Sequence, residues 1–148
     1  TMLLLGGAGL TTSYFDIGSS WARVTSDPRI RAAAGYVPYF GQPILPAFGR
    51  EQQGLDGIGL PFIGISGTAD TTAPISEAQT GISRLAGTRR LVALSGVAHE
   101  LDETSTGDIF TWALTFLDAE VRGDQEAVSR LSTMGSVAGG GDDSVLIR

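Results

Sequence analysis

The sequence contains no cysteine, and only one of its 148 residues, His99, is a histidine. Without cysteine the chain has no disulfide, no thiolate metal site and no cysteine nucleophile of its own. A single imidazole with scattered carboxylates also lacks the ligand spacing of a metal site, so we expect no metal and no cofactor. Within this chain, acid–base chemistry that needs an imidazole must use His99.

Basic residues are also scarce. The chain has 10 lysine and arginine residues against 16 acidic ones, which leaves a net charge of −6. Nucleic acids and anionic membranes attract clustered basic side chains, so we expect neither as a partner. The apolar stretch at residues 2–5 is too short to span a membrane, and no basic segment precedes it as in a signal peptide.

The hydrophobic content, 42% of the residues, is enough for a packed core, and the length fits one domain or part of one. Apolar runs at 30–39, 61–67 and 91–95 have the character of buried strands, and helical patterns follow the last two. This alternation predicts an α/β domain over residues 1–135, with a mainly parallel sheet flanked by helices. The glycine-rich segment near the end predicts a flexible tail over 136–148.

Further elements follow from local signals. Residues 1–10 are interpreted as part of a buried helix, 11–26 as a loop, and 40–60 as a long connection of the kind that carries function. Pro74 opens a helix that ends before Gly87, and Asp124 caps a short one. The expected inward residues of these two helices are Ile75, Ala78, Ile82 and Leu85, and Ala127, Val128 and Leu131.

The clearest helix spans residues 106–122, where apolar side chains recur at helical spacing. Its expected buried stripe consists of Ile109, Phe110, Ala113, Leu114, Leu117 and Val121. Both tryptophans, Trp21 and Trp112, are assigned to the core.

The most informative pattern is a phrase that occurs twice: an apolar strand that runs into a small turn with one ionisable residue. It is found at residues 62–70, ending in Asp70, and again at residues 91–99, ending in His99. Parallel strands present their carboxyl ends at one edge of a sheet, so the acid and the imidazole are expected within hydrogen-bonding distance. This is how an open α/β sheet presents the last two members of a Ser-Asp-His triad.

Each residue alone has a plainer interpretation. Asp70 lies in a Gly-Thr-Ala-Asp-Thr-Thr stretch, where aspartate often serves only the turn, and a lone histidine after a strand is often structural. The two residues at matching strand ends, in the order acid then histidine, favour the catalytic interpretation. The carboxylates near His99, those of Glu100, Asp102 and Glu103, are interpreted as solvated loop charges.

The nucleophile of such a triad is missing from the chain, which contains no G-x-S-x-G. The surroundings of Ser66, Ser95 and Ser136 do not fit a nucleophile elbow. The nearest approach, Gly64-Ile65-Ser66-Gly67-Thr68, lacks glycine at its last position and belongs to the strand before the acid.

Four stretches together resemble the C-terminal half of an α/β-hydrolase, most of all the dienelactone-hydrolase-like and platelet-activating-factor-acetylhydrolase-like esterases and the bacterial polyester hydrolases. Residues 67–74 are similar to the acid motif G-x-x-D-x-x-x-P of that group, and residues 95–99 to its G-x-x-H motif. Residues 27–32 look like the start of the strand after the nucleophile helix. Residues 116–119 with Gly123 and Asp124 resemble its C-terminal helices.

The resemblance implies a serine-type carboxylic ester hydrolase with an acyl-enzyme mechanism, acting on a small ester or a polyester. Asp70 would orient His99, His99 would act as the base, and Tyr39 and Phe40 would line an acyl or alcohol pocket. The nucleophile and both oxyanion donors would precede Thr1, so this part of the protein would need the N-terminal half of its own domain. Alone, it is expected to be inactive and prone to aggregate.

Other functions remain open on the sequence alone. The upstream nucleophile could be cysteine, as in a true dienelactone hydrolase, or the substrate could be an amide. The fold could instead serve as an inactive binding or structural module. A flavodoxin-like binder is less favoured, because the Gly6-Gly7-Ala8-Gly9 stretch matches no phosphate-binding fingerprint.

Overall fold

The computed structural model describes residues 2, 5–7, 10–11, 16–17, 26–42, 45–100, 102–134 and 143–147. They form an α/β fold built on a four-stranded mixed sheet in the order β3-β6-β7-β8. The first three strands are parallel, and β8 runs antiparallel to β7. The strands of this sheet are β3 (Ala33–Tyr36), β6 (Phe62–Gly67), β7 (Arg89–Leu94) and β8 (Ser144–Ile147).

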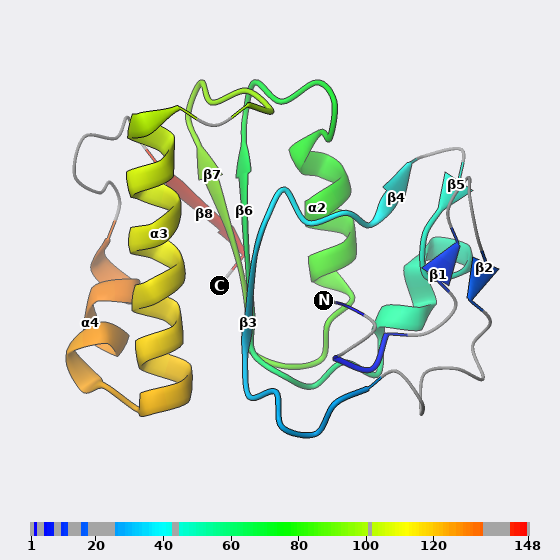
Figure 1. Cartoon of the computed structure of the whole chain (residues 1–148), viewed down its shortest axis with the longest axis horizontal. Coiled ribbons are helices and arrows are strands. Elements are labelled where there is room, and N and C mark those ends of the chain that lie inside the picture. The colour runs from blue at the N-terminus through cyan, green and yellow to red at the C-terminus, as the bar shows by residue number, and fades with distance from the viewer. Residues whose placement is uncertain are drawn as a thin grey trace.

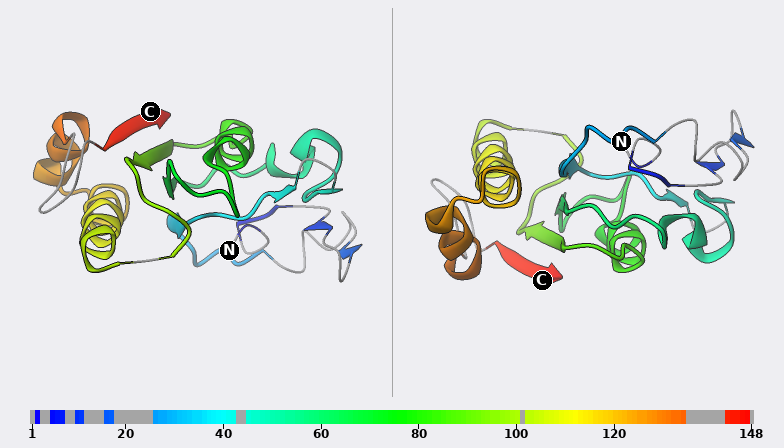
Figure 2. Two further views of the ribbon diagram at one scale, coloured as in Figure 1. Left: turned by 90° about the horizontal axis from the view of Figure 1, so that it is seen from above. Right: turned by 90° about the horizontal axis from the view of Figure 1, so that it is seen from below.

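Helices cover both faces of the sheet, with α2 on one face and α3 and α4 on the other (Figures 1 and 2). The helices are α2 (Ile75–Ser83), α3 (Glu103–Leu117), its π-helical extension η3 (Asp118–Arg122), and α4 (Gln125–Thr133). Two short antiparallel pairs lie apart from the main sheet. They are β1 (Leu10–Thr11) with β2 (Asp16–Ile17), and β4 (Gly41–Gln42) with β5 (Leu45–Pro46).

β6 is the central parallel strand, and all six of its residues are buried. Its apolar sequence reflects this burial, because a strand covered on both faces has no polar side. Phe62 joins the core on the α2 face, whereas Ile63 and Ile65 join the core under α3. The expected strands at 61–67 and 91–95 are confirmed as β6 and β7, and the one at 30–39 exists as β3 but is only half-buried.

β3 is shorter than the sequence pattern indicated. It ends at Tyr36 because Val37 has φ +43°, a left-handed conformation outside the strand region, and Pro38 follows. A β-branched residue in this conformation is strained by about 1–3 kcal/mol. After this turn the chain runs to Phe40, whose ring packs against Gly81 of α2.

The helix predicted over 106–122 exists, but it begins at Glu103 and buries a different face. The side chain of Asp102 accepts from the Ser105 backbone N–H at 2.7 Å, and this capping box starts the helix earlier. Trp112 and Phe116 are fully buried against the sheet. The core placement of Trp112 is therefore confirmed.

The predicted buried stripe of α3 is only partly right. Ile109, Ala113 and Leu117 pack against the core. Phe110, Leu114 and Val121 are instead 61%, 57% and 42% exposed. Apolar residues surround more than half of this helix, so periodicity alone could not tell which face the larger Trp112 and Phe116 would turn toward the sheet.

The other helices match the sequence more closely. In α2, Ala78, Ile82 and the following Leu85 are buried, and Ile75 is packed against the same core. In α4, Ala127 and Leu131 are buried, but Val128, expected inward, is 45% exposed. The helix expected at residues 1–10 is wrong for the described residues, which form turns and β1; Gly6 has φ +101°, outside the helical region. Trp21 lies outside the described residues.

Two segments predicted to be irregular, 136–148 and 40–60, contain strands or helical turns. The expected tail at 136–148 is wrong for Ser144–Ile147, which form β8 on the outer side of β7. The connection at 40–60 contains β4, β5 and the short 3₁₀ segment η2 (Arg50–Leu55), and it buries Phe48, Leu55 and Ile58. No helix among the described residues is long and apolar enough to cross a membrane.

The close contact between Phe40 and α2 gives a test of this packing. A methyl group at Gly81 would overlap the Phe40 ring, whereas a methyl group at Gly107 in α3 would enter open space. Both glycines are inside helices, so alanine gains about 0.5–1 kcal/mol of helix propensity at either position. We expect Gly107→Ala to be neutral or stabilising and Gly81→Ala to lower the unfolding free energy by about 1–3 kcal/mol, measured by chemical denaturation. Equal effects at the two sites would contradict this packing.

Candidate active site

Asp70 and His99 follow the carboxyl ends of two neighbouring parallel strands. β6 and β7 pair in register over six residue pairs, the last being Gly67 with Leu94. The two strands therefore end at the same level, and their turns lie side by side at one edge of the sheet (Figure 1). Open α/β sheets bind ligands at this edge.

The structure brings the two side chains together as the sequence predicted. His99 Nδ1 lies 2.8 Å from Asp70 Oδ2. The side chain of Asp70 is fully buried, while that of His99 is 47% exposed. The acid thus contacts the Nδ1 edge of a half-exposed imidazole. A neutral imidazole that donates from Nδ1 to Asp70 has Nε2 free as a base.

Asp70 also holds the turn that contains it. Its Oδ1 accepts from the backbone N–H groups of Thr72 and Ala73, at 2.9 and 2.8 Å. Hence Asp70 both stabilises its turn, through Oδ1, and contacts the histidine, through Oδ2. The acid is held in place whether or not the imidazole moves.

The environment of Asp70 favours its ionised form. Burial by itself would raise the pKa of Asp70, but the N–H of Ala73, the imidazole of His99 and the N–H of Thr72 together hold the pKa below its usual value. A lowered pKa means that Asp70 stabilises the fold most fully above its ordinary pKa near 4. That contribution is lost as the pH falls through the folded-state pKa.

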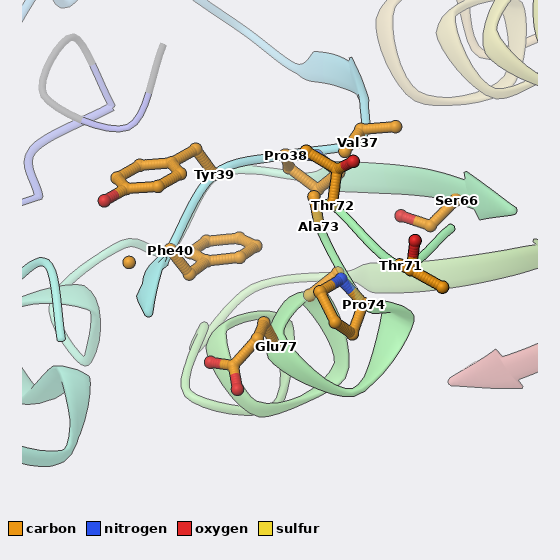
Figure 3. Close-up of a pocket in the computed structure, with 12 residues that line it drawn as sticks. Val37, Pro38, Tyr39, Phe40, Ser66, Thr71, Thr72, Ala73, Pro74 and Glu77 are labelled. Carbon is orange, nitrogen blue, oxygen red and sulfur yellow. The ribbon is translucent and has the colours of Figure 1, made fainter. Parts of the chain in front are cut away.

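A cavity of about 360 Å³ opens beside the acid turn. Figure 3 shows Tyr39 and Phe40 on one side of it, and Ser66 with Thr71 on the other. Tyr39 is 50% exposed and Phe40 is 1% exposed, so Phe40 belongs to the core as well as to the cavity wall. Both residues line the cavity as predicted, and their role toward a substrate stays a prediction.

Sequence reasoning missed the other wall of this cavity. It consists of the turn directly after the acid and the first turns of α2, with Thr71, Thr72, Pro74, Glu77 and Ala78 among its residues. A usable signal was present, because residues that directly follow a strand-end acid share its edge of the sheet. The wall is apolar except for the threonine hydroxyls, the Glu77 carboxylate and the Ser66 hydroxyl.

Neither described serine near the site occupies a nucleophile elbow. Ser66 lies inside β6, where it pairs with Ala93 of β7, and it is almost fully buried. Ser95 is in the turn that leads to the histidine, with no helix directly after it. An elbow needs a sharp turn from a strand into a helix. Ser136 lies outside the described residues.

Two of the three acidic residues interpreted as solvated loop charges, Asp102 and Glu103, instead belong to the start of α3. Asp102 is the N-cap of α3, and Glu103 is in the first helical turn, where negative charge is favourable. Glu100 is exposed. The described part of the chain holds no group of three or more histidine, aspartate or glutamate side chains that could bind a metal ion.

A second acidic residue, Asp108, is buried under the histidine turn. It is 3% exposed, and its Oδ1 has no hydrogen-bond partner among the described residues. Burial raises the pKa of Asp108, and the charges of Asp143 and Asp102 raise it further. Asp108 lines a polar cavity of about 400 Å³ that also borders Ser95 and Gly96.

Comparison with known proteins does not assign this chain to a family. No protein-family model matches it, and no curated protein matches it at a significant level.

Asparagine at position 70 separates the two roles of the acid. Asp70→Asn keeps an oxygen that accepts from Thr72 and Ala73 but presents an amide N–H₂ to the imidazole, which then favours the other tautomer. We expect the fold to persist and the ¹⁵N shifts of His99 to exchange their protonated and unprotonated positions. Asp70→Ala should instead lower the unfolding free energy by about 1–3 kcal/mol, because two backbone N–H groups lose their acceptor. An unchanged tautomer in the asparagine variant would show that Asp70 does not orient His99.

Stability around Asp108 should depend on pH in the opposite sense to Asp70. The pKa of Asp108 is raised in the folded protein. Its contribution to the unfolding free energy is therefore fully present below the ordinary pKa near 4, and it is lost as the pH rises through the folded-state pKa. Asp108→Asn should raise the unfolding free energy by about 1 kcal/mol at pH 8, with the gain disappearing toward pH 4. Glu100→Gln, on the exposed neighbouring turn, should show no such gain. Thermal unfolding over this pH range measures both.

Proposed function

We propose that this chain carries the acid and the base of a serine-type carboxylic ester hydrolase of the α/β-hydrolase superfamily. The observation that carries the proposal is the 2.8 Å contact between His99 Nδ1 and a fully buried Asp70 carboxylate at adjacent strand ends. The chain order acid then histidine is that of α/β-hydrolases. The cavity next to the Asp70 turn, whose wall includes Thr71 and Thr72, gives a place for the ester.

The proposed mechanism assigns one task to each residue. A serine from a preceding segment of the same polypeptide attacks the ester carbonyl, and His99 Nε2 takes its proton. Asp70 keeps the imidazole in the required tautomer and stabilises the imidazolium that forms. The protonated His99 then gives its proton to the leaving alcohol. The imidazole, neutral again, takes a proton from the water that attacks the acyl-enzyme.

The proposed substrate is a small ester or a polyester. The apolar wall formed by Tyr39 and Phe40 suits an acyl or alcohol group, and Tyr39 is exposed enough to contact a ligand. The few polar groups of the opposite wall would orient the substrate rather than bind a charge. Such a combination of apolar walls and few polar groups is typical of small-molecule sites.

Two surfaces support the need for a preceding half of the same domain. β3 has no strand beyond it among the described residues, so one edge of the parallel sheet is open. α3 packs over β3 and exposes Phe110 and Leu114. A further parallel strand and its helix would cover both the open edge and the exposed apolar side chains.

The role of His99 is tested by substitution in the intact polypeptide. His99→Ala removes the base, so turnover of a p-nitrophenyl ester should fall by about 10⁴-fold or more. The melting temperature should change little, because the imidazole is half exposed. Glu100→Gln on the same turn is the matched control and should keep activity near that of the unmodified protein. Retained turnover in the alanine variant would end the hydrolase proposal.

The position of the nucleophile is tested with a fluorophosphonate, which labels activated serines. We expect the intact polypeptide to be labelled and the isolated 148-residue chain to be unlabelled and prone to aggregate. If the isolated chain is labelled, the nucleophile lies within it and its proposed origin is wrong. If only a thiol reagent inactivates the intact polypeptide, the chemistry is that of a cysteine hydrolase. No labelling of either form would favour an inactive binding module.

A further inference from the structure

The turn that carries His99 is anchored by Thr68, which directly follows β6, and by Tyr36, the last residue of β3. We propose that Thr68 and Tyr36 are positioning residues that hold this turn, and with it His99, in register with Asp70. The inference rests on the proposed function for its catalytic consequence. Its geometric content is independent of that function.

The pairing of β6 and β7 continues past the ends of both strands. The Thr68 N–H donates to the Leu94 carbonyl at 2.9 Å, and the Ala69 N–H donates to the Val97 carbonyl at 3.0 Å. Between these two bonds, the Gly96 N–H donates to the Thr68 hydroxyl oxygen at 2.8 Å. Thr68 therefore links the acid turn to the histidine turn through both its backbone and its side chain.

The side-chain bond matters because the histidine turn closes weakly on itself. The internal bond from the Val97 N–H to the Leu94 carbonyl is 3.4 Å long, near the limit for such bonds. Gly96 adopts φ +73°, which only glycine adopts readily. Thr68 and Gly96 are both exposed, so their bond is not a by-product of core packing. The bond to the Thr68 hydroxyl, at 2.8 Å, is thus shorter than the backbone bonds that hold the turn, which are 2.9–3.4 Å long.

Tyr36 restrains the same turn from β3, on the far side of β6. Its hydroxyl donates to the carbonyl of Ala98, the residue before His99, at 3.3 Å, which is long for a hydroxyl donor, so Tyr36 is the weaker of the two anchors. Its ring packs in the core cluster that also contacts Val97. Burial raises the pKa of Tyr36, and the charges of Asp70 and Asp102 raise it further, so the hydroxyl stays protonated as a donor at neutral pH.

His99 needs such support because little else holds it. Its side chain is 47% exposed, and the bond to Asp70 is the only hydrogen bond of its ring within the described part of the chain. Proton transfer is sensitive to position, since an error of about 1 Å costs about 10²-fold in rate. If the turn that carries His99 moved, Nε2 would be displaced while the buried Asp70 carboxylate stayed in place.

The experiment removes each anchor in the intact polypeptide. Thr68→Val keeps the size and branching of threonine but removes the acceptor, and Tyr36→Phe removes only the donor. Thr68→Ser restores the hydroxyl and should rescue the first variant. Thr80→Val is the matched control, because the Thr80 hydroxyl donates to the Ser76 carbonyl of its own helix and not to the histidine turn, which is fully described from Ser95 to Glu100.

Two readouts separate anchoring from catalysis. Hydrogen exchange at the Gly96 amide should speed up about tenfold in Thr68→Val and stay normal in Thr68→Ser and Thr80→Val. With a p-nitrophenyl ester, kcat should fall by about fivefold to tenfold in Thr68→Val and Tyr36→Phe, with KM unchanged, because the substrate walls are untouched.

Unchanged hydrogen exchange at the Gly96 amide in Thr68→Val overturns the proposed anchoring of the turn by the Thr68 hydroxyl. Faster exchange with normal kcat, in a protein that His99→Ala inactivates, overturns the positioning role and leaves the proposed function standing. Retained turnover in His99→Ala overturns the proposed function, and faster exchange would then still establish the link between the two turns.

Discussion

The parallel pairing of β6 with β7 is the constraint on which the rest of the site depends. Their in-register ladder brings both carboxyl ends to one level and continues into the following turns through Thr68 and Ala69. Asp70 and His99 meet because these two turns are linked. Hydrophobic burial supplies the rigidity, since the central strand is covered on both faces by the cores under α2 and α3.

Asp70 shows how a buried carboxylate is accommodated mainly by donors from its own turn. Three donors compensate its burial, two of them backbone N–H groups from its own turn. Its ionised state therefore does not depend on a protonated histidine. Asp108 is the contrasting case, because its buried Oδ1 lacks a donor and the nearby acids disfavour its charge. Asp70 and Asp108 are buried to a similar extent, and they differ in the hydrogen-bond donors that surround them.

Local patterns were reliable where a residue's surroundings are dictated by its neighbours in the chain. The three parallel strands, the helix after Pro74 and the Asp124 cap all follow from apolar runs, proline geometry and side-chain capping. Local patterns failed where the position of a residue depends on contacts with distant parts of the chain. The inward face of α3 depends on Trp112 and Phe116 meeting the sheet, and β8 depends on the free edge of β7. The short segment at 144–147 carries no signal of that partner.

The sequence by itself determined the α/β class and placed one acid and the one imidazole after successive strands, because apolar runs and turns are local properties. It also indicated Tyr39 and Phe40 as cavity residues. Only the tertiary structure decided that Asp70 divides its two oxygens between its own turn and His99. It also decided which residues form the opposite cavity wall and which bonds anchor the histidine turn. These depend on distances between residues far apart in the chain, and a local pattern contains no information about those distances.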